Sequence, residues 1–346
     1  MFSKNLRYYR LKNSMTMKAL ADKSNLTAMA ISHYEKGTRK PSMDILKKLA
    51  EALNVRVSDF LIARNDKLVF THGEFRKTSK LTVTKQDYVR ESVEEYFGRF
   101  YTVVELLGGE VLPEAPECHV LSMTGDVEAD ARAMRLHLGI AEEGPVNDLI
   151  TILENKGILV YICDIESKKF SGMNGFVNDR PYIIVNGNMS PERNRSTIAH
   201  ELAHLFFDWP DDMDEKEAED TATAIAGAFL FLQADAMREL GIRRNSVTKD
   251  MILVCREYGI SMFLLVKRAQ IAKIISKDAA QRFYVAASKC GWRTNEPSRI
   301  APEKPELFEQ LVFRAVSEGE ISIQRGAELL RMSYDEVVSH CCFDEG

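Results

Sequence analysis

Short helical patterns fill the first 65 residues of the chain. Apolar residues recur there at three- and four-residue spacing, and polar, Gly or Pro residues interrupt the pattern between helices. Thr16 and Thr27 can each cap the helix that follows, and Ser24-Asn25 breaks the chain between them. The pattern predicts five short helices, over residues 2–11, 17–24, 27–34, 43–53 and 58–62.

The apolar pattern of the middle region changes from a helical period to that of strands. Residues 85–107 suit one long amphipathic helix, and two shorter helices are expected over 127–138 and 145–156, the second ending with Gly157 at its C′ position. Three apolar runs then predict strands over 158–163, 175–177 and 182–185, with residues 178–181 as the turn between the last two. A small sheet is therefore expected within a mainly helical chain.

An apolar helix follows these strands and carries two histidines one turn apart. Residues 198–207 are apolar except for His200, Glu201 and His204. Pro210 ends this helix, and a second helix with an inward apolar face begins near Glu215. Further helices are expected over 252–275, with a break at 259–261, and over 279–289. The expected fold class is mainly α with a small β-sheet (α+β).

Composition is that of an ordinary globular protein, with 45% apolar and 28% charged residues among 346. The longest nearly apolar run, 222–232, is shorter than the roughly 20 residues that span a bilayer, and the N-terminus lacks the apolar core of a signal peptide. We therefore expect a cytoplasmic protein without membrane contact. Six cysteines at scattered spacings predict reduced thiols, and the adjacent pair Cys341 and Cys342 leaves metal binding or a redox role open.

Charge is unevenly distributed along the chain. Residues 1–65 hold 13 Lys and Arg against 5 Asp and Glu, a net charge of +8, whereas the remaining residues carry −13. A polyanion is therefore expected to meet only the N-terminal part.

The N-terminal helices resemble a known DNA-binding family. Residues 20–27, 31–37, 41–42 and 49–50 resemble the XRE/Cro-repressor helix-turn-helix family, and the likeness covers nearly all of residues 4–62. The resemblance implies a five-helix domain whose third helix enters the major groove of double-stranded DNA. The residues implied to face base edges are Ala28, Met29, Ser32 and His33, and those implied to face phosphates are Lys36, Arg39 and Lys40.

This sequence departs from the usual form of that family at the positions that read bases. Ala28 and Met29 offer no bidentate donor to a guanine or adenine, so base reading would rest on Ser32 and His33. Phosphate contacts need only charge and position, and they are retained. The competing interpretation is a small helical bundle that dimerises the chain or holds a partner protein.

His200, Glu201 and His204 form an HExxH motif, which arises by chance in only about 1% of chains of this composition. Residues i and i+4 of a helix share a face, so both imidazoles can bind one tetrahedral Zn²⁺ with Glu201 near its open position. A catalytic zinc ordinarily takes a third protein ligand, and Glu215 and Glu219 both lie beside or on the inward face of the next helix. The motif predicts the zinc site of a metallopeptidase.

Residues 193–199 before the motif and 219–226 after it resemble the ImmA/IrrE family of zinc metallopeptidases. The segments 259–261, 267–269 and 291–293 extend the likeness to longer members that carry an N-terminal XRE domain. The resemblance implies one catalytic Zn²⁺, with Glu219 as its third ligand and Glu215 as the alternative if the register shifts by a turn. It also implies a protein substrate, such as a repressor, in stress response or mobile-element control.

The expected domains are a helix-turn-helix domain (1–65), a linker and helical connector (66–125), a zincin-like metallopeptidase domain (126–240) and a helical C-terminal region (241–346). Residues 321–333 have a second helix-turn-helix-like spacing, which we interpret as a packing helix pair. Homodimerisation stays open. The competing function is a non-proteolytic transcription factor or antitoxin-like binding protein whose zincin domain acts as a sensor or scaffold.

Overall fold

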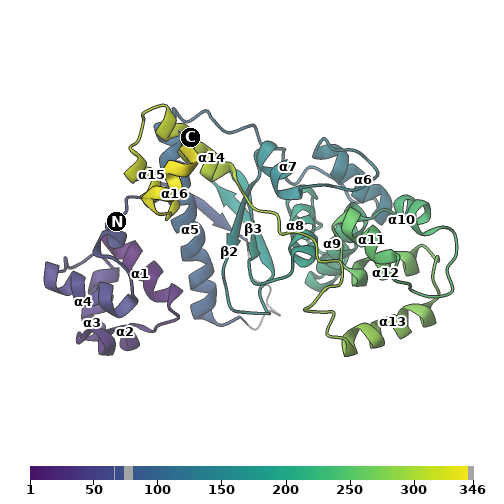
Figure 1. Cartoon of the computed structure of the whole chain (residues 1–346), viewed down its shortest axis with the longest axis horizontal. Helices are drawn as coiled ribbons and strands as arrows, with labels where there is room; N and C mark the ends of the chain where they lie inside the picture. The colour runs from purple at the N-terminus through teal and green to yellow at the C-terminus, as the bar shows by residue number, and fades with distance from the viewer. Residues whose placement is uncertain (66, 74–80, 342–346) are drawn as a thin grey trace. The chain divides into compact units, whose positions relative to one another are not determined.

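The computed structural model describes residues 1–65, 67–73 and 81–341, and these residues form two compact units (Figure 1). The head unit holds the described residues of 1–70, 75–112 and 306–346, and the sheet unit holds those of 71–74 and 113–305. The two units are defined by which residues pack together in the folded chain. The four domains expected from the sequence remain predictions. Cys342 lies outside the described residues, and the five described cysteines form no disulfide with one another.

The first part of the head unit is the expected series of short helices. Thr16 accepts a hydrogen bond from the Ala19 amide at 3.0 Å and Thr27 accepts one from the Ala30 amide at 3.1 Å, so both predicted caps are confirmed. The final segment is a 3₁₀ helix, which is tighter than the helix expected there. The elements are α1 (Phe2–Lys12), α2 (Met17–Ser24), α3 (Ala28–Glu35), α4 (Met43–Leu53) and η1 (Val57–Phe60).

The head unit also contains the long helix α5 (Val83–Leu106) and three helices from the C-terminal end of the chain. These are α14 (Leu307–Ser317), α15 (Ile323–Leu330) and α16 (Tyr334–Cys341). The Phe308 ring of α14 packs against Tyr96 of α5, with the centroids 5.4 Å apart. Residues that are more than 200 positions apart in the sequence therefore share one core.

A buried charge cluster connects these C-terminal helices to α5 and α1. The Glu95 carboxylate lies 2.8 Å from both Arg99 and Arg331. Burial alone would raise the pKa of Glu95, but the two guanidinium groups hold that pKa below its ordinary value. Arg331 also donates a hydrogen bond to the Tyr8 hydroxyl at 2.8 Å and lies over the Tyr8 ring. Arg331, at the end of α15, therefore contacts both α1 and α5.

The pair α15 and α16 is joined by a short turn in which Arg331 has a φ of +59°. Val337 of α16 is fully buried, and Gly326 of α15 lies close to Val312 of α14. The exposed side of α16 carries Asp335 and Glu336, which would repel a phosphate backbone. These contacts favour the interpretation of a packing helix pair.

The sheet unit is built around four strands in the order β1-β3-β4-β2. Strand β2 pairs with β4 in parallel, with Leu159 opposite Tyr182, and β3 pairs with β4 antiparallel, with Gly172 opposite Val185. The strands are β1 (Phe70–His72), β2 (Leu159–Cys163), β3 (Gly172–Val177) and β4 (Arg180–Asn186). Three of them were predicted from the sequence, and β1 begins in the apolar run 68–70, which allowed either a linker or a short strand pair.

The hairpin between β3 and β4 is tighter than expected. Only Asn178 and Asp179 form the loop, with φ values of +48° and +62°, whereas Arg180 and Pro181 already belong to β4. A two-residue loop with both φ values positive matches the twist of the flanking strands, and Asn and Asp tolerate that conformation better than most residues.

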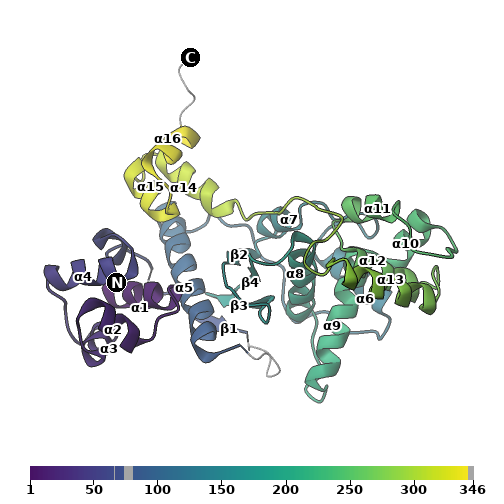
Figure 2. The same cartoon turned by 60° about the horizontal axis from the view of Figure 1, so that its bottom comes forward.

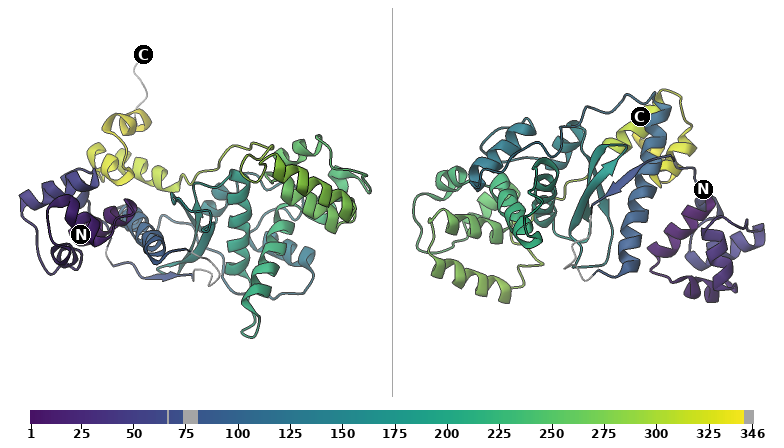
Figure 3. Two further views of the ribbon diagram at one scale, coloured as in Figure 1. Left: turned by 90° about the horizontal axis from the view of Figure 1, so that it is seen from below. Right: turned by 180° about the vertical axis from the view of Figure 1, so that it is seen from behind.

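Helix α8 (Pro191–Phe206), which carries the two histidines, packs between the sheet and α9 (Glu215–Leu230) (Figure 2). Ile183 and Val185 of β4 form one buried core with Ile198 and Leu202 of α8. The views in Figure 3 show the same layers from two further sides. The remaining helices are α6 (Val127–His137), α7 (Leu149–Asn155), α10 (Gln233–Leu240), α11 (Met251–Tyr258), α12 (Met262–Ile271) and α13 (Lys277–Lys289).

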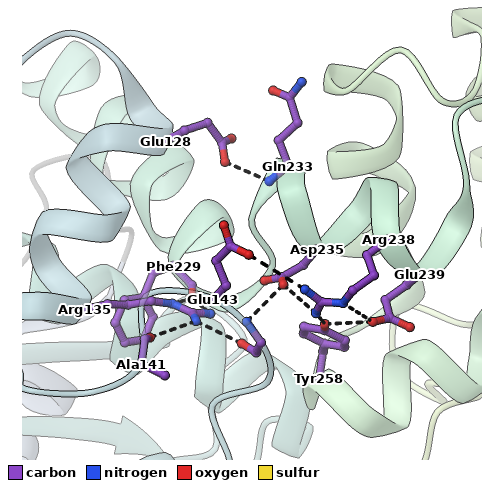
Figure 4. Close-up of polar contacts among 11 residues, drawn as sticks. Glu128, Arg135, Ala141, Glu143, Phe229, Gln233, Asp235, Arg238, Glu239 and Tyr258 are labelled. Atoms are coloured by element: carbon purple, nitrogen blue, oxygen red, sulfur yellow. Dashed lines mark hydrogen bonds and ion pairs between the residues drawn. The ribbon is translucent and has the colours of Figure 1, made fainter.

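A polar network fixes the end of α9 against its neighbours (Figure 4). The buried Arg135 of α6 donates to the carbonyl of Phe229 at 2.8 Å, and Asp235 of α10 accepts a hydrogen bond from Arg238 at 2.7 Å. Arg238 also donates to the Tyr258 hydroxyl of α11 at 2.5 Å. The Arg135 guanidinium therefore holds the C-terminal end of α9, and Arg238 connects α10 to α11.

None of the described helices combines the length and the apolar character that a bilayer crossing needs.

Candidate metal centre and DNA-contacting surface

Helix α8 begins and ends where its sequence dictates. Ser190 accepts a hydrogen bond from the Arg193 amide at 3.3 Å, and Pro191 occupies the first turn, where a missing N–H costs nothing. Phe207 has an extended conformation (ψ 143°), so the helix is already complete before Pro210. His200 and His204 therefore lie in the last two turns of a regular helix.

Both imidazoles turn the same nitrogen towards one point. The Nε2 atoms of His200 and His204 are 3.2 Å apart, and the Glu219 carboxylate of α9 lies 3.3 Å from the first and 3.5 Å from the second. Ligand atoms held about 2.0–2.1 Å from a tetrahedral Zn²⁺ lie roughly 3.3 Å from one another. The three side chains thus fit one zinc ion, and they form the group of possible metal ligands found among the described residues. Glu215, one turn earlier on α9, is exposed and lies outside this group.

Two further contacts orient the histidines. The Thr223 hydroxyl, one turn beyond Glu219 on α9, lies 3.3 Å from Nδ1 of His200. If Nδ1 carries the proton and donates to Thr223, the Nε2 lone pair is left to face the metal position. The Trp209 ring lies against His204, with centroids 5.0 Å apart. Neither contact could be predicted from the sequence, because both depend on how the two helices and the loop between them pack in space.

Glu201 is buried and is held by a strand residue. Its Oε2 accepts a hydrogen bond from Nδ2 of Asn174 at 2.8 Å, and the residue is 7% exposed. Asn174 lies on β3, on the face of the sheet that carries Ile183 and packs against α8. This amide donor fixes the rotation of the carboxylate and leaves Oε1 available to a water or substrate. An Asn in a strand with apolar neighbours was the signal that could have identified this residue.

The edge of β3 beside Glu201 is covered by the chain itself. The amide of Gly73 donates to the carbonyl of Asn174 at 2.9 Å, and β1 lies next to β3 in the sheet (Figure 2). An unpaired strand edge beside the helix with the two histidines could hold an extended peptide by backbone pairing. Strand β3 offers no such edge, because β1 and β4 pair with its two sides.

The predicted DNA-contacting residues lie on and just after α3. Ala28, Met29 and His33 are exposed, Met29 to 72%, whereas Ser32 is half-buried. The His33 Nδ1 lies 2.9 Å from the Thr38 hydroxyl, so this imidazole has a partner within the domain.

The three predicted phosphate contacts, Lys36, Arg39 and Lys40, are all exposed. Glu35 would oppose them, but it accepts two hydrogen bonds from Arg10, at 2.5 and 2.8 Å, in a buried ion pair. Its negative charge is therefore neutralised within the head unit, and the basic residues define the sign of this surface.

Two family models match separate parts of the chain, one that contains the predicted DNA-contacting residues and one that contains the candidate metal ligands. Residues 6–60 match the family model described as helix-turn-helix, and residues 153–270 match the model of the IrrE N-terminal-like domain, a peptidase family. No curated protein and no solved structure matches the chain. Helix α3 falls within the first match, and His200, Glu201, His204 and Glu219 fall within the second. The chain therefore joins an XRE-type helix-turn-helix domain to an IrrE/ImmA-like peptidase-family domain.

Proposed function

We propose that this protein is a cytoplasmic DNA-binding regulator whose IrrE-like domain is a zinc-dependent metallopeptidase that cleaves a partner regulator, such as a repressor, in stress response or mobile-element control. The observation that supports this most directly is the convergence of His200, His204 and Glu219 beside the buried carboxylate of Glu201. A purely structural metal site would need no such carboxylate next to the ligands.

In this proposal His200, His204 and Glu219 hold the ion and Glu201 handles the proton. A zinc ion held by these residues would supply Lewis acidity and would lower the pKa of a water bound to it towards about 7. Glu201 accepts a proton from the attacking water and returns it to the leaving amine, so its carboxylate is regenerated. Asn174 keeps Glu201 in position through the 2.8 Å hydrogen bond to Oε2.

Glu201→Gln tests the peptidase role. The variant is expected to keep the zinc content of the unmodified protein, measured by elemental analysis, and to lose cleavage of a co-purified or candidate repressor. Glu217→Gln, an exposed carboxylate on α9, makes the same charge change outside the cluster and serves as the control. Cleavage by Glu201→Gln at the unmodified rate would refute the assignment of Glu201 as general base.

A sensor or scaffold function is the second candidate, and the covered edge of β3 favours it. A peptide substrate that approaches Glu201 along the sheet must pair with β1 or displace it, so the site as described has no free β3 edge to offer. In this case Glu201→Gln leaves regulation of the target promoter unchanged, and no cleavage product accumulates with the unmodified protein.

The head is proposed to bind double-stranded DNA through α3, with phosphates contacted by Lys36, Arg39 and Lys40. Each lost phosphate contact reduces the slope of log K against log salt by about 0.9, so Arg39→Ala/Lys40→Ala should reduce it by roughly 2. Lys47→Ala/Lys48→Ala makes the same charge change at exposed positions of α4 and is the matched control. If the unmodified head shows no salt-dependent binding to DNA, the protein-binding adaptor becomes the better explanation.

A further inference from the structure

A cavity of about 320 Å³ lies in the sheet unit, and none of its lining residues belongs to the metal centre. It opens between α13 and the segment 246–249 that precedes α11. Its volume is at the lower end of the range of small-molecule sites, roughly 300–1,000 Å³.

The inner walls of this cavity are apolar. Met262, at the start of α12, and Phe283 of α13 are buried, and the Trp292 ring lies 6.0 Å from the Phe283 ring between centroids. Val247 and Ile252 complete the apolar lining, together with three alanines of α13. An apolar chain or ring bound here would be removed from water and would contact side chains on several sides.

Two cations, Lys249 and Arg282, line the same cavity, and no acidic residue does. Both side chains belong to exposed residues, and neither forms an ion pair with another residue in the part of the chain that the structure describes. Asp250, the residue after Lys249, is already paired with Arg244 at 2.5 Å. The positive charge at this cavity is therefore left for an external anion.

We propose that this cavity binds the anion of a small amphipathic carboxylic acid, with a medium-length apolar chain against Phe283 and Trp292 and the carboxylate between Lys249 and Arg282. Apolar walls alone would accept a neutral molecule equally well, whereas the two cations favour an anion through charge-assisted hydrogen bonds. The inference does not depend on zinc binding or on proteolysis, since it uses none of the residues of the metal centre.

Sodium decanoate, below its micelle concentration, is the probe for the full-length protein. The chain has two tryptophans, so Trp209→Phe leaves Trp292 as the sole indole and as a reporter inside the cavity. We expect a saturable change in its fluorescence, with at least a tenfold weaker dissociation constant in Lys249→Gln/Arg282→Gln. Lys277→Gln/Lys289→Gln removes the same charge from α13 at positions that do not line the cavity and should bind as the parent does.

A second readout avoids any change near the metal centre. Cys290 is exposed and lines the cavity, so decanoate should slow its alkylation in the unmodified protein, as located by mass spectrometry. The proposal is overturned if the fluorescence change is linear and does not saturate, if the Lys249/Arg282 variant binds as tightly as its parent, or if 1-decanol binds as tightly as decanoate.

Discussion

Replacing Glu219 by Gln should separate the two candidate third ligands of the metal centre. The substitution preserves the size of the side chain but removes the charge of a carboxylate whose oxygens lie 3.3 and 3.5 Å from the two imidazole nitrogens. Glu215→Gln makes the same change one turn earlier on α9, at an exposed residue outside the cluster. The two variants therefore remove the same charge one turn apart on α9, and only Glu219→Gln removes the carboxylate that faces His200 and His204.

The expected magnitude follows from the linkage of metal binding and folding. Loss of a residue behind the ligands commonly lowers metal affinity by about 10- to 100-fold, so loss of a direct ligand should cost at least about 100-fold. At a free zinc concentration of 100 times the dissociation constant, binding stabilises the native state by about 2.7 kcal/mol. For a unit of this size each kcal/mol shifts Tm by about 2–4 °C, which gives roughly 5–10 °C in total.

Calorimetry of the full-length protein with zinc and after chelation measures this shift. The unmodified protein and Glu215→Gln should each lose roughly 5–10 °C of Tm in the sheet unit on chelation, as estimated from linkage. Glu219→Gln should lose close to none. The reverse pattern would place Glu215 in the site and shift the register of α9 by one turn. An unmodified protein whose melting is indifferent to chelation would refute the metal centre itself.

Two further predictions concern stability. Arg331→Met should lower the free energy of unfolding by about 2–4 kcal/mol in urea titrations, because it leaves the buried Glu95 with a single guanidinium partner. Arg314→Met, which breaks an exposed ion pair, should cost under about 1 kcal/mol; equal effects of the two variants would contradict this reasoning. Burial, with the charge of Glu192, raises the pKa of Glu296 from 4.5 to about 7, so the native state binds this proton more tightly and stability should fall as pH rises from 4.5 to 7. Because Glu296 is partly exposed, Glu296→Gln should gain only about 1–2 kcal/mol relative to the unmodified protein between pH 5 and pH 8, and a constant difference across that range would argue against the shift.

The local elements could be predicted closely because their signals are local. Helices α2 and α4 occupy the predicted residues 17–24 and 43–53, since the caps Thr16 and Ser42 and the left-handed residues Asn25 and Asn54 define their ends. The signal for strand β1 was weaker, because the apolar run 68–70 fitted a linker as well as a short strand. β1 has three residues, and its partner strand β3 is about a hundred positions away, so only the assembled sheet reveals the pairing.

The two histidines of the candidate metal centre could also be predicted from a local signal, whereas the third ligand could not. The spacing of His200 and His204 follows from helix geometry alone, and the structure brings both to one point. The register of α9 against α8 depends on the conformation of the loop between them, which no periodicity encodes, so Glu215 and Glu219 both remained candidates. Thr223 and Asn174 were missed for a related reason, because a residue that supports another is identified only by the contact it makes.

Asn174 contacts both the segment that follows the helix-turn-helix match and the proposed general base Glu201. Its carbonyl accepts a hydrogen bond from the amide of Gly73, the residue after β1, and its side chain donates to Glu201. Residues 71–73 lie between the two family matches, so the segment that follows the DNA-binding domain in the chain also covers the strand beside the peptidase motif. Displacing β1 would free the Asn174 carbonyl for a peptide amide while the Glu201 contact, made by the side chain, could persist. The geometry therefore allows the edge of β3 to open without dismantling the metal centre.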